Sequence, residues 1–344
     1  MRNRKLSMVV AALLAVLAVA AGCAPKPGSG SGPAVRIGVG GQPLLVYLPT
    51  TLADRLGFYR EAGVQVELED LQGGSKALQA LQGGSVDVVS GYYDHAIQMQ
   101  AKGRDVVSFV NMLRYPSLVL AVSPKASRPI NSVADLKGAN VGVTAPGSST
   151  DFFLKYLLVK NGLAAEDAIV QGVGGDSTAV AAMEQGRVDA AVMLDPAVSQ
   201  LQQRVGADRV RVLTDTRTEQ GVREDFGVST YPAAVLYSTR EWLDAHPEQA
   251  RRLAAAIVRA LEWIRTHSAQ EIADRMPPEY AAGDRQVYVR SIEQVKAAYS
   301  PDGRIEADGA EAVRSVLARF IPEVAGADID LTRTYTNDYL PPAP

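Results

Sequence analysis

Short segments in which apolar residues alternate with polar residues or glycine are separated by stretches of helical periodicity. The strand-like segments are 35–39, 64–68, 86–90 and 106–110. The helical stretches are 48–56, 73–82 and 94–101, and glycines follow the first two. This order predicts a β-α-β-α-β-α-β arrangement, which folds as a largely parallel sheet with helices on both faces.

The same pattern recurs about 102 residues further along the chain. Residues 73–87 align with 175–189, and seven of the fifteen positions are identical. Val141-Gly-Val143 precedes the second copy at about the same distance as Ile37-Gly-Val39 precedes the first. Chance identity in an Ala/Gly/Val-rich chain is the alternative explanation. The repeat occurs only twice, and its period is too long for a solenoid, so it favours two similar α/β lobes.

Two apolar strands, at 118–122 and 233–237, have no place in this alternation and bracket the second copy. We therefore expect them to be crossovers between the lobes. Lobe 1 would then comprise residues 34–120 and 235–344, and lobe 2 residues 121–234. Helices expected at 241–267 and 284–299 would return to cover lobe 1.

The first 22 residues predict an export signal. Three basic residues within the first five positions precede an apolar run over 8–21, which is too short to span a bilayer comfortably. The following Ala20-Ala-Gly-Cys23 resembles a bacterial lipobox, with alanine where leucine is preferred at position 20. The resemblance implies cleavage after residue 22 and lipidation of Cys23. An ordinary signal peptide or an uncleaved anchor is the alternative.

Composition narrows the class of partner. Residues 23–33 are rich in Pro, Gly and Ser and predict a flexible tether. Removing residues 1–22 leaves 32 Lys and Arg against 38 Asp and Glu, a net charge of about −6. A mildly acidic, dispersed charge argues against a nucleic-acid partner. Cys23 is the only cysteine, and the three histidines are not spaced as metal ligands, so we expect no metal and no cofactor. We also expect the protein to be a monomer.

Several segments resemble the substrate-binding proteins of ABC importers for sulfonates, taurine, nitrate and thiamine-precursor pyrimidines. The matching segments are Leu52-Ala-Asp-Arg-Leu-Gly-Phe-Tyr-Arg-Glu-Ala-Gly-Val64, Gly73-Gly-Ser75, 80–87, Gly103, Ser132-Val-Ala-Asp-Leu-Lys-Gly138, 141–143, 186–190 and Asp195-Pro196. The likeness covers residues 35–198 and continues more weakly through the C-terminal helices.

This resemblance implies an α/β type II periplasmic-binding fold, with two doubly wound lobes that are joined by two crossover strands and close on a ligand by hinge rotation. It also implies an extracytoplasmic protein, lipid-anchored to the cell membrane, that binds a small organic solute and delivers it to an ABC-transporter permease. The alternatives are an enzyme related to the thiamine-pyrimidine synthases and the ligand-sensing subunit of a signalling system. The sequence contains no Walker A or GxSxG motif. We therefore do not expect an enzyme.

In such a fold the cleft lies at the C-terminal ends of the parallel strands, where helix N-termini present free N–H groups. The turn Gly73-Gly-Ser75 opens one helix, with Ser75 a good N-cap. Its counterpart in lobe 2 is Ala145-Pro-Gly-Ser-Ser-Thr150, which leads into a helix that begins near Asp151. Ser148, Ser149 and Thr150 are our first choice as hydrogen-bond donors to a ligand. Alternatively, these residues only cap their helices.

Aromatic and acidic residues at strand ends complete the predicted site, because a tyrosine ring offers a flat apolar face with a hydroxyl at its rim. Some of these tyrosines are alternatively core residues, and Asp94 and Asp195 are alternatively helix caps. If both carboxylates face the cleft, they favour a ligand with an amine, amidine or ring N–H over an oxyanion. His95 is expected to be an exposed residue in the first turn of its helix, with ligand binding as the alternative, and Asp87 and Asp189 are expected to have structural roles. The predicted ligand-binding residues are Gln42, Tyr47, Gly74, Ser75, Tyr92, Tyr93, Asp94, Tyr115, Ser148, Ser149, Thr150 and Asp195.

Overall fold

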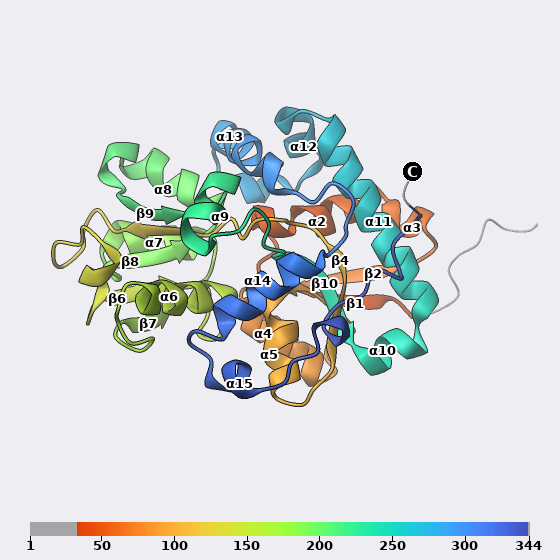
Figure 1. Ribbon diagram of the computed structural model, residues 1–344. Coiled ribbons are helices and arrows are strands. Elements are labelled where there is room, and N and C mark those ends of the chain that lie inside the picture. Colours follow the sequence, from red (N-terminus) through yellow and green to blue (C-terminus); the bar gives the residue numbers. More distant parts are fainter. Residues whose placement is uncertain (1–32, 343–344) are drawn as a thin grey trace, which may run out of the picture. The chain divides into compact units, whose positions relative to one another are not determined.

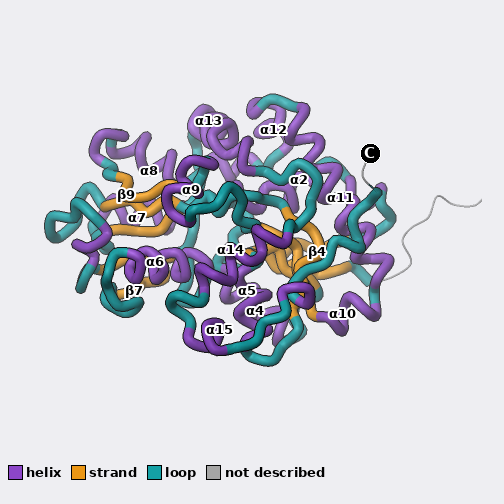
Figure 2. The backbone as a smooth tube through the Cα atoms, viewed as in Figure 1, coloured by secondary structure: helices purple, strands orange, loops and turns teal. Residues whose placement is uncertain are grey.

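The computed structural model describes residues 33–342, and its strands form two five-stranded sheets, each surrounded by helices (Figure 1). Figure 2 shows the strands in two separate groups. The lobe 1 sheet has the order β2-β1-β3-β10-β4 and the lobe 2 sheet the order β7-β6-β8-β5-β9. The strands are β1 (Val35–Val39), β2 (Val66–Asp70), β3 (Val88–Tyr92), β4 (Val106–Asn111), β5 (Val119–Val122), β6 (Asn140–Val143), β7 (Ile169–Gly172), β8 (Ala190–Met193), β9 (Val212–Asp215) and β10 (Ala234–Thr239).

The two sheets have the same strand order when β6, β7 and β8 are matched to β1, β2 and β3, so the repeat predicted from the sequence is confirmed. Asp87 and Asp189 also have equivalent roles. The Asp87 carboxylate accepts the Arg36 main-chain N–H at 2.9 Å, and the Asp189 carboxylate accepts the Asn140 main-chain N–H at 2.9 Å. Each aspartate therefore holds the start of the first strand of its own lobe, β1 or β6, which is a structural role.

The two strands expected as crossovers between the lobes, β5 and β10, are also members of the sheets. β5 pairs antiparallel with β8 and β9, and β10 pairs antiparallel with β3 and β4. The chain passes between the lobes just before each strand, over residues 112–118 and 216–233. Each sheet is therefore mixed and is completed by a strand that arrives directly from the other lobe.

Helix α11 (Pro247–Thr266) covers lobe 1 as expected, because one face of the helix is apolar and buried while arginines and glutamates lie on the other. It packs against α2 (Leu48–Arg55), α3 (Phe58–Glu61) and β4. Helix α13 (Arg285–Val295) contacts the short 3₁₀ helix at Leu45–Tyr47 in lobe 1 and also α8 (Ala197–Val205) of lobe 2.

The other helices flank the two sheets. Helix α14 (Ala307–Leu317), at the centre of Figure 1, contacts α5 (Asp94–Ala101) of lobe 1 and α6 (Ser149–Lys160) of lobe 2. No helix in residues 33–342 is long and apolar enough to cross a membrane. The remaining helices are α4 (Gly74–Gln82), α7 (Ser177–Gln185), α9 (Glu219–Phe226), α10 (Arg240–Ala245), α12 (Ala269–Arg275) and α15 (Pro322–Gly326).

Candidate functional site

The two glycine- and serine-rich turns that the sequence singled out face each other across the lobes. The Ser75 main-chain N–H donates to Ser148 Oγ at 3.0 Å, and the two hydroxyls are 3.1 Å apart. Ser75 Oγ also donates to the carbonyl oxygen of Pro146 at 3.0 Å. The lobes are thus closed onto each other, with α4 and α6 meeting at their N-termini.

Neither serine hydroxyl forms a capping hydrogen bond to its own helix. Gly73 is the N-cap of α4, and Ser148 is the N-cap of α6 without a side-chain bond to that helix. The expectation that Ser75 is an N-cap is therefore wrong, because its hydroxyl is turned to the opposite lobe. Helix α6 begins at Ser149, two residues earlier than expected. Thr150 acts within lobe 2, where its hydroxyl accepts the Thr144 main-chain N–H at 3.0 Å.

Asp94 is the acidic residue of the cleft. It is the first residue of α5, is 5% exposed, and accepts a 2.9 Å hydrogen bond from the Ser149 hydroxyl across the lobe boundary. Burial raises the pKa of this carboxyl above its ordinary value, although His95 and the Ser149 hydroxyl act in the opposite direction. The N-cap of α5 is Tyr93, so Asp94 is not the helix cap that the alternative interpretation proposed.

Two small adjoining cavities lie between the lobes, of about 20 Å³ and about 10 Å³, each large enough for a single water molecule. They share Tyr92, Leu118 and Ser149 in their walls. The first cavity is also lined by Asp94, Pro116, Phe152, Phe153, Phe226, Tyr231, Val316 and Leu317. The second is also lined by Gly40, Leu44, Tyr47, Gly74, Thr144, Ser148, Thr150 and Leu194. An organic solute therefore requires the lobes to separate before it binds.

The structure brings most of the predicted residues to this cleft. Those that line a cavity are Tyr47, Gly74, Tyr92, Asp94, Ser148, Ser149 and Thr150, and Ser75 lies at the closing turn. Tyr93 points elsewhere, because its hydroxyl lies 2.5 Å from Thr334 Oγ1 and its ring packs edge-on against Tyr335. Gln42 contacts Asp70 through its main-chain N–H, at 3.0 Å.

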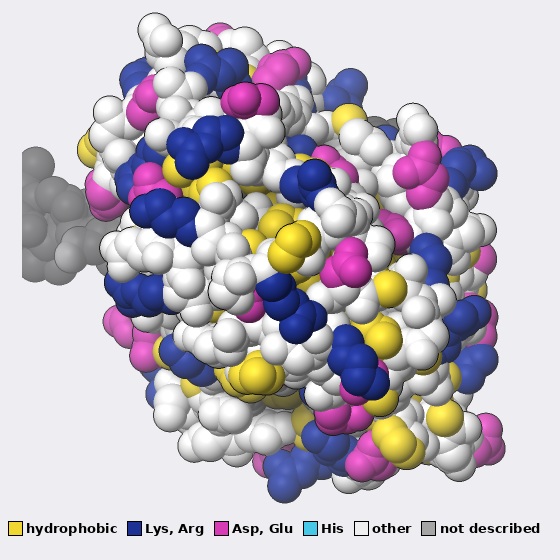
Figure 3. Space-filling model, turned by 90° about the vertical axis from the view of Figure 1, so that its left-hand side faces the viewer, with side chains coloured by type: hydrophobic (Ala, Val, Ile, Leu, Met, Phe, Trp, Pro, Cys, Tyr) yellow, Lys and Arg dark blue, Asp and Glu magenta, His cyan; other side chains and the backbone are white. Residues whose placement is uncertain are grey.

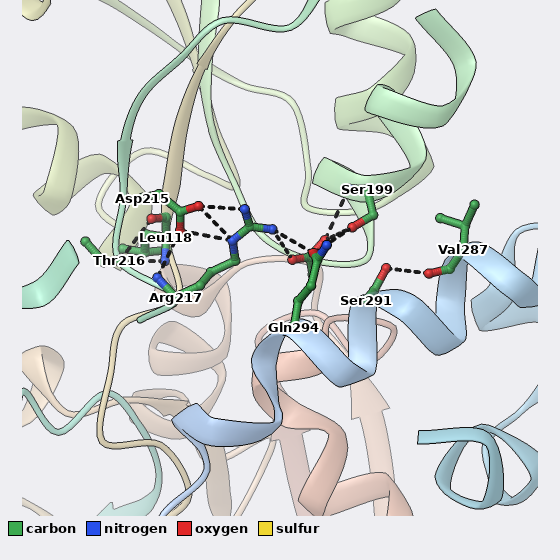
Figure 4. Close-up of polar contacts among 9 residues, drawn as sticks. Leu118, Ser199, Asp215, Thr216, Arg217, Val287, Ser291 and Gln294 are labelled. Atoms are coloured by element: carbon green, nitrogen blue, oxygen red, sulfur yellow. Dashed lines mark hydrogen bonds and ion pairs between the residues drawn. The ribbon is translucent and has the colours of Figure 1, made fainter. Parts of the chain in front are cut away.

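Tyr115 and Asp195 lie in the contacts near the crossover segments. The Tyr115 hydroxyl donates to Glu219 at 3.3 Å. Asp195 pairs with Arg217 at 2.8 Å and accepts the Ser199 hydroxyl at 2.7 Å, so both of its oxygens are engaged. Arg217 also contacts Gln294 of α13 at 3.1 Å (Figure 4). This cluster links lobe 2 to α13, and neither Tyr115 nor Asp195 lines either of the two cavities.

Four aromatic residues of the cleft, Phe152, Phe153, Phe226 and Tyr231, were not predicted from the sequence. The Phe pair follows the serines of the α6 turn directly, and that proximity was the available signal. Phe226 ends α9 and stacks on Tyr231 with ring centroids 4.5 Å apart. Both belong to the second crossing segment, which sequence alone could not place against α6.

His95 is also placed differently from the sequence expectation of an exposed side chain. It is fully buried, with Nε2 3.3 Å from the Gly147 carbonyl oxygen and Nδ1 3.3 Å from the Tyr237 hydroxyl. The ring packs edge-on against Phe152 of α6. The lobe 2 turn covers the first turn of α5, and this tertiary contact removes His95 from solvent.

Comparisons with known proteins agree with this geometry. A family model described as NMT1/THI5 like matches residues 46–271. A solved structure of a protein from Bordetella bronchiseptica RB50 is 42% identical, with a TM-score of 0.84, covering 89% of this chain and 95% of that one. The alkanesulfonate-binding protein SsuA from Xanthomonas axonopodis pv. citri, bound to MOPS, is 21% identical with a TM-score of 0.66, covering 89% and 99% of the two chains.

Two curated relatives are more distant. "Putative binding protein YtlA" of Bacillus subtilis (strain 168) is 22% identical and covers 75% of each chain. A 4-amino-5-hydroxymethyl-2-methylpyrimidine phosphate synthase of Aspergillus parasiticus is 23% identical, over 86% of this chain and 83% of its own. The two sheets, their shared strand order and the structural neighbours confirm the two-lobed fold of periplasmic binding proteins. Since the family model spans more than half of the chain, this protein belongs to the NMT1/THI5-like family.

Proposed function

We propose that this protein is an extracytoplasmic solute-binding protein that captures a small organic solute between its lobes and delivers it to an ABC-transporter permease. The observation that carries the proposal is the pair of facing helix N-terminal turns, where Ser75 and Ser148 bond across the cleft. Those turns enclose a lining of polar and aromatic side chains. Free N–H groups at helix N-termini and tyrosine faces suit a small ligand with polar groups on a flat body.

The closed state explains how such a protein would work. In the closed cleft, the serine contacts occupy hydrogen-bonding groups that become available when the lobes separate. A bound solute would then replace these contacts by its own and stabilise closure, in the manner of hinge closure around a ligand. A permease would distinguish the ligand-closed form from the open one by the relative position of the lobe surfaces.

The distribution of charged side chains on the end of lobe 2 is consistent with a small-molecule ligand rather than a nucleic acid. Figure 3 shows Lys and Arg interspersed with Asp and Glu over this face, without a basic stripe of the kind that binds nucleic acid. The lipid anchor that we propose at Cys23 lies outside the described residues. Mass spectrometry of the N-terminal peptide tests it, because a diacylglyceryl group on the Cys23 sulfur adds the mass of glycerol and two acyl chains, and Cys23→Ala should abolish this addition.

A ligand screen tests the binding function. Thermal-shift measurements with sulfonates, amino-sulfonates, pyrimidines and aromatic acids should find a stabilising compound, since a solute at a hundredfold its Kd adds about 2.7 kcal/mol. Ser149→Trp, which fills the cleft, should abolish the shift. The matched control Ser315→Trp replaces an exposed serine on α14, and the shift should persist. Turnover of the bound compound by the purified protein would support the enzyme alternative instead.

A further inference from the structure

Aromatic rings from both lobes form much of the wall of the larger cavity, beside Asp94. Five rings line it: Tyr92, Phe152, Phe153, Phe226 and Tyr231. Tyr92 ends β3 in lobe 1, the two phenylalanines lie on α6 in lobe 2, and the other two residues lie on the second crossing segment. Because the negatively charged faces of aromatic rings attract cations, such a box is the common protein site for substituted ammonium groups.

The charged groups of the cavity walls have one sign. Asp94 is the single carboxylate among the lining residues of the two cavities, and those linings contain no lysine or arginine. Two basic side chains of lobe 2 are engaged elsewhere: Arg217 pairs with Asp195 and Asp215 at 2.8 and 2.6 Å, and Lys155 lies 3.4 Å from Asp151. The His95 ring, next to Asp94 in the chain, contacts the Tyr237 hydroxyl and the Gly147 carbonyl oxygen, each at 3.3 Å. Asp94 forms no ion pair with any residue in the described part of the chain.

The Asp94 carboxylate has capacity for a ligand. Its side-chain hydrogen bond comes from Ser149, whereas a carboxylate accepts several bonds through its two oxygens. A buried carboxylate without a cation is unfavourable. Burial raises the pKa of Asp94, and a bound cation would favour its ionised form. The same carboxylate would repel an oxyanion placed in the adjoining box, because charges interact strongly in a water-poor site.

We infer that the cleft selects solutes that carry a cationic nitrogen, held against Asp94 inside the aromatic box, and that it rejects sulfonates and other oxyanions. This inference rests on the proposed solute-binding function and names the charge class of its ligand. The five rings bind the substituents of the nitrogen, while Asp94 accepts its N–H groups or balances its charge.

The first test measures head-group preference on the wild-type protein. Nine probes combine three skeletons, ethyl, benzyl and pyrimidin-4-ylmethyl, with three head groups, ammonium, hydroxyl and sulfonate. Isothermal titration at pH 8 should give the tightest binding for an ammonium compound, at least tenfold tighter than the matching alcohol, with no binding of the sulfonate. A tightest binder that is an alcohol or a sulfonate, or no binding by any of the nine, overturns the inference.

The second test isolates the carboxylate. Asp94→Asn keeps the side-chain shape and the acceptor for Ser149, and it should weaken the best ammonium probe at least tenfold while leaving the matching alcohol unchanged. Asp87→Asn removes the carboxylate that pairs with Arg36 at the start of β3, far from the cleft lining, and binding should persist. Circular dichroism verifies folding of both variants. Equal loss for ammonium and alcohol, or no loss, contradicts a charge-selective role for Asp94.

A third variant tests the aromatic box, and the combined outcomes distinguish a failure of the cation inference from a failure of the solute-binding function. Tyr231→Leu removes one ring of the box without changing charge, and it should weaken the ammonium probe several-fold more than the alcohol. If a sulfonate binds and Ser149→Trp abolishes that binding, the solute-binding function stands and the cation inference falls. If no solute of any class binds, both fall.

Discussion

Ser149, in the first turn of α6, donates a 2.9 Å hydrogen bond to Asp94, the first residue of α5, and so joins lobe 2 to lobe 1 at the wall of the cavity. Both residues are buried. Opening of the lobes must separate this pair and expose the carboxylate to solvent. The same contact therefore contributes to closure and holds the single carboxylate of the cavity walls in place.

Asp94 is expected to reduce the stability of the ligand-free protein at neutral pH. Its pKa is raised in the folded state by burial, so the folded protein is stabilised below the ordinary carboxyl value of 3.8 and loses that stabilisation as the pH rises through the folded value. Asp94→Asn should therefore raise the melting temperature at pH 7. The difference from wild type should shrink as the pH falls toward 3.8.

Calorimetric melts of the two proteins from pH 4 to pH 8 measure this difference. The other ionisable side chains near Asp94 are His95 on the same helix and Tyr47, Tyr92, Tyr231 and Tyr237, and burial raises the pKa of each of these tyrosines above its ordinary value. They are present in both proteins, so subtracting one melt from the other removes their direct contribution. A variant less stable than wild type at pH 7 would show that the Asp94 charge is balanced in the closed protein.

Gly73 is expected to permit closure. Its backbone is extended, and a Cβ at this position would lie 3.0 Å from the Ala145 Cβ of lobe 2. Gly73→Val should therefore hold the lobes apart and weaken ligand binding tenfold or more. Gly83→Ala is the matched control at the other end of α4, where the added Cβ makes an ordinary 3.4 Å contact.

Titration calorimetry with the ligand from the screen measures affinity, and small-angle scattering measures compaction on binding. The valine variant should stay expanded at saturating ligand, whereas the Gly83 variant should contract as wild type does. Full affinity with normal contraction in Gly73→Val would mean that the turns move apart without loss of the closed state.

Arg217 is expected to stabilise the protein strongly. Its side chain is only 13% exposed and pairs with Asp195, which is fully buried, and with Asp215. Arg217→Ala would leave Asp195 without its cation, which costs about 3–5 kcal/mol. Arg223→Ala removes an exposed helical pair with Glu219, and the loss should be much smaller because solvent screens that pair. Urea unfolding compares the two variants, and similar losses would contradict the role assigned to the buried pair.

Asp189 is expected to make lobe 2 sensitive to acid. Burial alone would raise its pKa, but hydrogen bonds from the Ser127 hydroxyl and from the main-chain N–H groups of Ser127 and Asn140 lower it overall. A lowered pKa stabilises the fold above the ordinary value of 3.8, and this stabilisation is lost as the pH falls through the folded value. Asp189→Asn should cost about 1–3 kcal/mol at pH 7.

Urea midpoints at pH 7 and pH 3.5 measure the effect for Asp189→Asn and for its repeat equivalent, Asp87→Asn. The cost of each substitution should narrow at the lower pH, and the more exposed Asp87 should show the smaller effect at pH 7. A cost for Asp189→Asn that is the same at both values would show that the carboxylate charge is not what its partners require.

The sequence by itself determined the alternation of strands and helices and the duplication of the lobe, because periodicity and glycine punctuation depend on neighbouring residues. It also indicated the Gly73–Ser75 and Ala145–Thr150 turns, since parallel strands bring the helices that follow them to one edge of each sheet. The sheet pairing of β5 and β10 could not be predicted in this way. Their apolar patterns indicate crossover strands, but only the hydrogen bonds in the tertiary structure show which strands they pair with.

Only the tertiary structure decided which polar groups belong to the cleft. Asp94 and Asp195 had the same two interpretations in the sequence, and their environments separate them: Asp195 is balanced by Arg217, whereas Asp94 meets Ser149, 55 positions away. The aromatic box likewise joins α6 to the second crossing segment. These contacts form when two lobes close on each other, and the free energy of closure depends on packing between distant segments that no local pattern specifies.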